Sequence, residues 1–79
     1  MKNKFDKKIK RIMASVFETS IEMISDDASP HNIKNWDSLK HIKLIVALED
    51  EFNIKIEVDE INAMVKFSII SAYIHAQYN

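Results

Sequence analysis

The chain of 79 residues contains no glycine and a single proline, Pro30. Two-residue β-hairpins depend on Asn-Gly, Asp-Gly or Gly-X turns, because the central residues of these turns need positive φ angles. Helices that are joined by longer links need such turns much less. A β-rich fold would lack its turn residues here, so the composition predicts an all-α protein.

The rest of the composition limits the number of domains, the kinds of site and the cellular environment of this fold. Apolar residues make up 47% of the chain, which suffices for one core, and we expect residues 1–79 to form a single domain. Cysteine is absent, which excludes disulfides, thiolate metal sites and a cysteine nucleophile. The longest apolar run, residues 44–48, is too short to span a membrane, and the N-terminus lacks the apolar segment of a signal peptide. We therefore expect a soluble, cytoplasmic monomer without membrane insertion.

Apolar residues recur at helical spacing near the start of the chain. They predict an amphipathic helix over about residues 4–19, with Asn3 as its N-cap and Asp6 in its first turn. The stripe consists of Phe5, Ile9, Ile12, Met13, Val16 and Phe17. Residues 20–36 follow as a long ordered loop, of a length typical of functional segments or of loops with a short helical turn. The apolar side chains expected to hold this loop to the core are Ile21, Met23, Ile24 and Ile33.

Three further helices are expected after this loop, over about residues 38–52, 59–65 and 67–77. Asp37 or Ser38 would cap the first of them. The last helix would bury Ile69, Ile70, Tyr73 and Ile74. Residues 54–58 alternate like a strand, but no second alternating run exists to pair with them, so we expect an extended connector. The sequence thus predicts a small four-helix bundle with a long first loop and a short third helix.

The charges are distributed unevenly along the chain. Six basic side chains against one acid give the first eleven residues a charge of +5, and the remaining residues carry −6. The basic residues are Lys2, Lys4, Lys7, Lys8, Lys10 and Arg11, and the acid is Asp6. Such a segment leaves a helical nucleic-acid or protein-interaction module open as an alternative, although a solvated helix face is the more common case.

Signatures of catalytic sites are missing. His31, His41 and His75 lack metal-ligand spacing, and a chain without glycine has no P-loop and no dinucleotide fingerprint. Asp37, Ser38 and His41 resemble a catalytic triad in residue type only. Side chains of adjacent helical residues point about 100° apart, which leaves Asp37 badly placed to orient His41. We therefore expect no catalytic residues and no metal site.

The helix expected over residues 38–52 has two apolar faces. The core face consists of Leu44, Ile45, Leu48 and Phe52, and the second face consists of Leu39, Ile42 and Val46. In so short a chain a peripheral helix is buried on one side only, so the second face predicts a surface for a partner. A central helix that is buried on both sides is the alternative.

The charges of this helix oppose its macrodipole. The first turns hold Lys40, His41 and Lys43, and the last turn holds Glu49, Asp50 and Glu51. Each mismatch destabilises the helix by about 0.3–1 kcal/mol at low salt. No Lys–Glu pair at i, i+3 or i, i+4 within the helix offsets the loss. Charges in these positions indicate a role outside the helix.

Two segments of this helix region resemble acyl carrier proteins. They are residues 35–39, with the sequence NWDSL, and residues 47–52, with the sequence ALEDEF. Chain length, mid-chain motif, preceding loop and the apolar Ile54-x-Ile56 are similar as well, and the resemblance spans about residues 9–76. It implies that a phosphopantetheinyl transferase modifies Ser38 with 4′-phosphopantetheine from coenzyme A. The thiol of this arm would then carry acyl groups as thioesters to acyl-loading and acyl-processing enzymes.

The resemblance also assigns roles to residues near Ser38. Asp37 matches the family acid beside the attachment site, and Leu39 matches the apolar residue next to it. The positions that would dock partner enzymes are Lys40, Ile42, Lys43, Val46, Glu49 and Asp50. The residues that would line an acyl pocket are Leu48, Ile56, Ile61 and Met64. Trp36 resembles the aromatic residue of a subset of carriers, and we expect it to wedge the loop against Ile42 or His41.

This sequence also departs from the family pattern. Lys40 and Lys43 stand where fatty-acid carriers usually have acids. Electrostatic complementarity governs partner choice, so we expect dedicated partners in a polyketide, lipid or glycan-modifying pathway. Peptidyl carriers usually show Gly-Gly-His before the serine, where residues 35–37 read NWD. An aminoacyl cargo stays open as an alternative.

Overall fold

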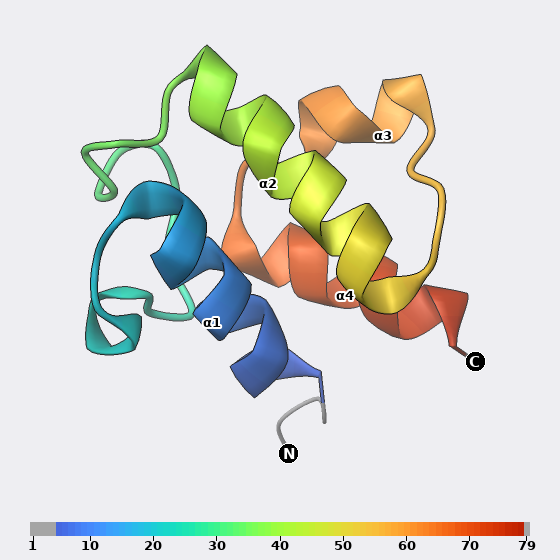
Figure 1. The fold of residues 1–79 in the computed structure, drawn as a ribbon, viewed down its shortest axis with the longest axis horizontal. Helices are drawn as coiled ribbons and strands as arrows, with labels where there is room; N and C mark the ends of the chain where they lie inside the picture. Colours follow the sequence, from blue (N-terminus) through green and yellow to red (C-terminus); the bar gives the residue numbers. More distant parts are fainter. Residues whose placement is uncertain (1–4, 79) are drawn as a thin grey trace.

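The computed structural model describes residues 5–78, and these residues form helices without any strand (Figure 1). The elements are α1 (Asp6–Phe17), the 3₁₀ turn η1 (Ile21–Met23), α2 (Ser38–Phe52), α3 (Val58–Ala63) and α4 (Phe67–Gln77). The all-α fold with a long first loop and a short third helix is therefore confirmed. The predicted bounds of α2 and α4 are also correct. The predicted N-cap Asn3 lies outside the described residues.

The first helix is shorter than the predicted 4–19 because Glu18 adopts the left-handed conformation, with φ 58°. The backbone N–H of Thr19 then donates to the carbonyl oxygen of Ala14 at 2.9 Å, which closes the helix end. Asn53 ends α2 in the same way, with φ 53°. Left-handed caps are usually glycine. In a chain without glycine, a glutamate and an asparagine take this conformation instead.

The third helix covers Val58–Ala63 rather than residues 59–65. It ends early because Met64 leaves helical geometry, with ψ 59°, and its side chain is fully buried in the core. The connector before α3 is extended and unpaired among the described residues, as predicted. The chain thus turns inward at Met64 before α4 begins.

The core lies between α1, α2 and α4 and also takes in the long loop. Its loop members are Ile24, Ala28, Ile33 and Trp36. The prediction for Met23 was wrong, since this side chain is 63% exposed. With three residues per turn, η1 aligns Ile21 with Ile24 and leaves Met23 facing away.

In α4 the buried stripe consists of Phe67, Ile70 and Ile74, at positions i, i+3 and i+7. The prediction for Ile69 was wrong, because this side chain lies beside the stripe and is exposed. Tyr73 is only partly buried at the edge of the core. The helix therefore buries a narrower face than its apolar sequence indicated.

Hydrogen bonds order the long loop. Asn35 Nδ2 donates to the Phe17 carbonyl oxygen at 2.8 Å, which fixes the end of the loop to the end of α1. The Phe67 N–H donates to the Ala28 carbonyl oxygen at 2.9 Å, which fixes the middle of the loop to the start of α4. The loop therefore approaches α2 in a defined position.

In the part of the N-terminal segment that the structure describes, two lysines form ion pairs with other segments of the chain. Lys8 contacts Glu51 of α2 at 3.1 Å, and Lys10 contacts Asp26 of the loop at 2.8 Å. These pairs reduce the charge that this segment presents to a polyanion. None of the helices in the described part of the chain has the length and apolarity that a membrane crossing requires.

Candidate functional site

The predicted attachment residue Ser38 is the first residue of α2, and its side chain is exposed. Asp37 provides the cap, because its Oδ1 accepts a hydrogen bond from the Lys40 backbone N–H at 2.8 Å. The Ser38 hydroxyl is therefore not needed to cap the helix. A helix start of this kind combines unpaired N–H groups with the positive end of the macrodipole, which suits an attached phosphate.

Trp36, directly before this cap, packs against two rings. Its indole is 7% exposed and lies 4.8 Å from the Phe17 ring and 6.1 Å from the His41 ring, measured between centroids. The prediction that Trp36 wedges the loop against His41 is confirmed. The aromatic contacts hold the loop against the ends of both α1 and α2.

A hydrogen-bonded chain continues from Trp36 to α3. Trp36 Nε1–H donates to His41 Nδ1 at 3.1 Å, and His41 Nε2 lies 2.7 Å from the Ile61 carbonyl oxygen. An indole N–H is a donor only, so Nδ1 accepts and Nε2–H donates to Ile61. The network thus uses both ring nitrogens of His41. We call this arrangement of Trp36, His41 and the Ile61 carbonyl the His41 bridge.

A cavity of about 390 Å³ adjoins Ser38. Its lining residues are Pro30, Trp36, Asp37, Ser38, His41, Asn62 and Val65. Proline, tryptophan and valine provide apolar walls, while the carboxylate, the imidazole and the amide provide polar groups. Sequence reasoning missed Pro30, Asn62 and Val65, because they come from the loop and from the α3 region, far from Ser38 in sequence.

The second apolar face of α2 is exposed to solvent, as predicted. Leu39, Ile42 and Val46 are each more than half exposed. The four residues of the core face are at most 4% exposed, and they are Leu44, Ile45, Leu48 and Phe52. The alternative of a helix buried on both sides is therefore excluded. This face continues along α2 from Ser38.

Lys40 is held by α1. Its Nζ lies 2.9 Å from Glu18 Oε2, and only 18% of its side chain is exposed. The hydrogen bond from Lys40, followed by the charges of Lys40 and Lys43, lowers the pKa of Glu18. The charge of Lys40 is thus paired within the chain, whereas Lys43 is exposed. No spacing pattern predicts this pair, since Glu18 and Lys40 are 22 residues apart.

At the other end of α2, Glu49 also bonds within the chain. Its Oε2 accepts a hydrogen bond from the Ile56 backbone N–H at 2.8 Å and so fixes the connector after α2. Asp50 is exposed. Of the two acids that the family resemblance assigns to docking, Asp50 is the more accessible.

The residues predicted to line an acyl pocket belong to the core or pack against it. Leu48 and Met64 are fully buried, Ile56 is buried, and Ile61 packs against the core from α3. Their role as the lining of an acyl pocket stays a prediction.

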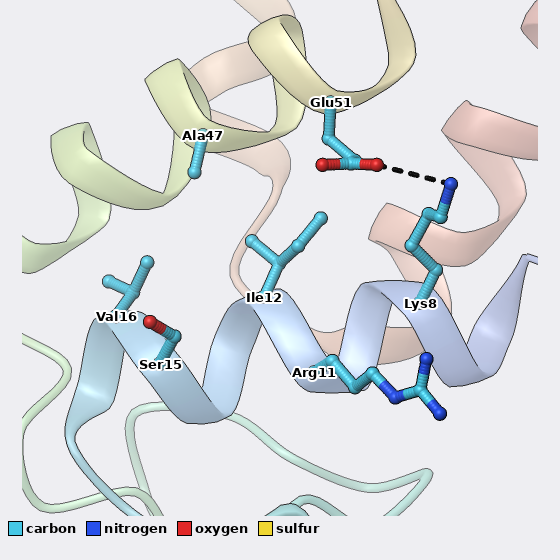
Figure 2. A pocket seen from close by; sticks show the side chains of 7 residues that line it. All are labelled: Lys8, Arg11, Ile12, Ser15, Val16, Ala47 and Glu51. Atoms are coloured by element: carbon cyan, nitrogen blue, oxygen red, sulfur yellow. Dashed lines mark ion pairs between the residues drawn. The ribbon is translucent and has the colours of Figure 1, made fainter.

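A second hollow of about 380 Å³ lies between α1 and α2, away from Ser38. Figure 2 shows Ile12 and Val16 pointing from α1 toward Ala47 of α2, with the ion pair between Lys8 and Glu51 at one side. None of the predicted site residues lines this hollow. It does not form part of the candidate site.

Known proteins resemble this chain over most of its length. The family model described as "Phosphopantetheine attachment site" matches residues 7–67. An "Acyl carrier protein" of Buchnera aphidicola subsp. Schizaphis graminum (strain Sg) is 34% identical over 67 residues, which cover 81% of this chain and 85% of that protein. The protein of the same name from Buchnera aphidicola subsp. Acyrthosiphon pisum (strain Tuc7) is 39% identical over 69 residues, with 84% and 85% covered. The chain belongs to the acyl carrier protein family.

As an acyl carrier protein, the chain takes 4′-phosphopantetheine as a covalently attached prosthetic group. Acyl carrier proteins are carriers rather than catalysts, and they work with a phosphopantetheinyl transferase and with acyl-processing enzymes. The resemblance drawn from residues 35–39 and 47–52 is thereby confirmed. The matched residues 7–67 include α2 and the cavity beside Ser38.

Proposed function

We propose that Ser38 is the attachment site of the phosphopantetheine arm and that the protein carries acyl groups on this arm. The observation that carries the proposal is the exposed hydroxyl on the first residue of α2, with Asp37 serving as the cap. Ser38 Oγ would form a bond to the phosphate next to pantetheine. The pyrophosphate bond of coenzyme A would break, adenosine 3′,5′-bisphosphate would leave, and the hydroxyl proton would pass to a base of the transferase.

Intact-mass measurement tests this proposal directly. After incubation with a promiscuous phosphopantetheinyl transferase and coenzyme A, we expect the mass of one added arm in the wild type and none in Ser38→Ala. Ser68→Ala is a matched control, because Ser68 is also exposed and lies in the first turn of another helix, α4. An arm on the Ser38→Ala protein, or its loss from the Ser68→Ala protein, would contradict the assignment.

We propose further that the exposed face of α2 docks the partner enzymes. Leu39, Ile42 and Val46 form its apolar part and lie next to the arm. Its charge differs from that of fatty-acid carriers mainly at Lys43, because Lys40 is paired with Glu18. This charge supports dedicated partners rather than the general fatty-acid synthase.

Docking rates onto housekeeping fatty-acid synthase enzymes test the choice of partner. We expect Lys43→Glu to dock faster than the wild type, because it replaces an exposed repulsive charge near Ser38. Lys40→Asp serves as the comparison, since Glu18 already cancels part of the charge of Lys40 in the wild type. Equal docking rates for the wild type and for both variants would count against a dedicated pathway.

The buried cluster of Leu48, Ile56, Ile61 and Met64 is our proposed shelter for long acyl chains. Its side chains are apolar and belong to the core or pack against it, so a chain that leaves the solvent would gain the favourable free energy of apolar burial there. Met64→Trp would fill this region. We expect it to reduce the protection of a hexadecanoyl chain without changing the attachment of the arm.

A further inference from the structure

The His41 bridge is a contact that attachment of the arm does not by itself require. It joins three segments next to Ser38, namely the loop through Trp36, the first turns of α2 through His41, and α3 through Ile61. Both ring nitrogens of His41 are used, one as acceptor and one as donor. The bridge therefore fixes the distance between α2 and α3 at the end of α2 where the arm is attached.

Few contacts besides the bridge hold α3 against α2. The helix has six residues, Ile61 is its side chain packed against the core, and Val58 at its start is 74% exposed. In residues 5–78, the bond from His41 to Ile61 is the one side-chain hydrogen bond between α2 and α3. It reaches a carbonyl near the C-terminal end of α3 that also accepts the Met64 N–H at 3.3 Å. Figure 1 shows α3 lying beside α2 in this arrangement.

The bridge also lies beside Ser38. His41 is three residues after Ser38, about one helical turn, so the two side chains lie on neighbouring parts of the helix surface. Both line the cavity of about 390 Å³. A chain tethered at Ser38 that entered the bundle between α2 and α3 would meet the bridge that joins them.

Opening this gap would leave the Trp36 indole N–H without its partner and would leave the Ile61 carbonyl with the Met64 N–H alone. The Trp36 indole N–H and the Ile61 carbonyl are part-buried where they bond His41, and polar groups that lose their partners away from water carry a large penalty. Only a chain longer than octanoyl gains enough from burial to offset this penalty, because the gain grows with each buried methylene. A short chain gains too little.

We propose that His41 is a positioning and specificity-determining residue whose bridge keeps short or polar acyl groups outside the bundle. This inference rests on the proposed function of Ser38. The cargo then lies at the cavity beside Ser38, where Asn62 and Asp37 offer polar contacts and Val65 an apolar wall. The favoured cargo class is short or polar acyl groups rather than long aliphatic chains.

The test compares two cargoes on the complete protein. Acetyl and octanoyl arms are transferred from the corresponding acyl-coenzyme A esters, and the melting temperature of each loaded protein is measured. In the wild type we expect the octanoyl and acetyl forms to melt within about 1 °C of each other, while in His41→Ala the octanoyl form melts about 4–8 °C higher than the acetyl form. His31→Ala is the matched control, because His31 is exposed on the loop and should behave like the wild type.

Two further variants separate positioning from general stability. Trp36→Phe removes the indole N–H and keeps an aromatic ring, so it opens the bridge if His41→Ala does not fold. His41→Gln retains one acceptor and one donor. We expect its difference in melting temperature between the octanoyl and acetyl forms to be smaller than that of His41→Ala and closer to the wild-type value. Each variant is compared with its own acetyl form, so a uniform loss of stability does not affect the result. Methyl NMR shifts of Met64 should respond to octanoyl in the opened variants only.

The inference is overturned if octanoyl raises the wild-type melting temperature as much as that of His41→Ala. It is also overturned if octanoyl has no effect in either opened variant. Intact mass separates this failure from failure of the proposed function. If Ser38 takes no arm, both proposals fall, whereas a loaded protein with the wrong melting behaviour contradicts only the role of His41.

Discussion

The two ends of α2 differ in what surrounds them. The N-terminal end presents Ser38 and Leu39 to solvent and is held from the side by His41. At the C-terminal end Phe52 is 4% exposed, and its ring lies 6.2 Å from that of Tyr78, whose hydroxyl also donates to the Phe52 carbonyl oxygen. One helix is thus anchored at one end and accessible at the other. This arrangement suits a site that must remain open to a transferase without loosening the fold.

The charges of α2 sharpen the comparison. All five charged side chains oppose the macrodipole, yet three of them bond to other segments of the chain, namely Lys40, Glu49 and Glu51. Lys43 and Asp50 are exposed. The inference that these charges act outside the helix therefore has an internal explanation for most of them. Lys43 and Asp50 are the two that we propose for partner recognition.

The largest expected difference between the two ends is in apolar burial. Phe52→Ala should lower the free energy of unfolding by about 3–5 kcal/mol, because it leaves a cavity in the core. Leu39→Ala should change it by no more than about 0.5 kcal/mol, because that side chain is exposed. Urea unfolding followed by circular dichroism measures both. Similar losses for the two variants would show that the N-terminal end of α2 is not an accessible surface.

The next effect concerns the two acids near the C-terminal end. Glu49→Ala should lower the free energy of unfolding by about 1–3 kcal/mol, because it removes the acceptor of the part-buried Ile56 N–H. Glu49→Gln keeps an acceptor and should lose less. Asp50→Asn should leave stability nearly unchanged and alter only docking. If Asp50→Asn destabilises the protein as much as Glu49→Ala, the division between structural and exposed charges is wrong.

The two caps of α2 should respond in opposite directions. Asp37→Ala removes the acceptor of the Lys40 N–H and should lower the free energy of unfolding by about 1 kcal/mol. Asn53→Gly should raise it by about 0.5 kcal/mol, because glycine takes a positive φ without a steric penalty. Thermal unfolding of both variants and of the wild type measures these two changes in stability. A loss of stability in Asn53→Gly would mean that the asparagine makes compensating contacts.

Sequence patterns predicted the parts of this protein that depend on local periodicity. The bounds of α2, its two faces and the position of Ser38 follow from residues close together in the chain. The early end of α1 could not be predicted in this way. It depends on the left-handed conformation of Glu18, and glutamate seldom adopts that conformation.

The contacts between distant segments could not be predicted from the sequence either. Trp36 was expected to meet His41, but the hydrogen bond from His41 onward to Ile61 joins residues 20 positions apart. The cavity beside Ser38 is likewise lined by Asn62 of α3 and by Val65, which follows α3. Spacing along the chain carries no information about such pairs, which depend on how the helices pack.

The smallest expected effect is that of the pair between Glu18 and Lys40. The folded-state pKa of Glu18 is lowered by its hydrogen bond with Lys40, so the pair stabilises the protein above the ordinary carboxyl pKa of 4.5 and loses this effect as the pH falls through the lowered value. The melting temperature of the wild type should exceed that of Glu18→Gln slightly at pH 7 and low salt. The difference should shrink below pH 4.5 and also in high salt, because an exposed pair is screened. A difference that grows on acidification would assign the stabilising role to another group, and the N-terminal end of α2 would then depend on the His41 bridge and the Asp37 cap for its position.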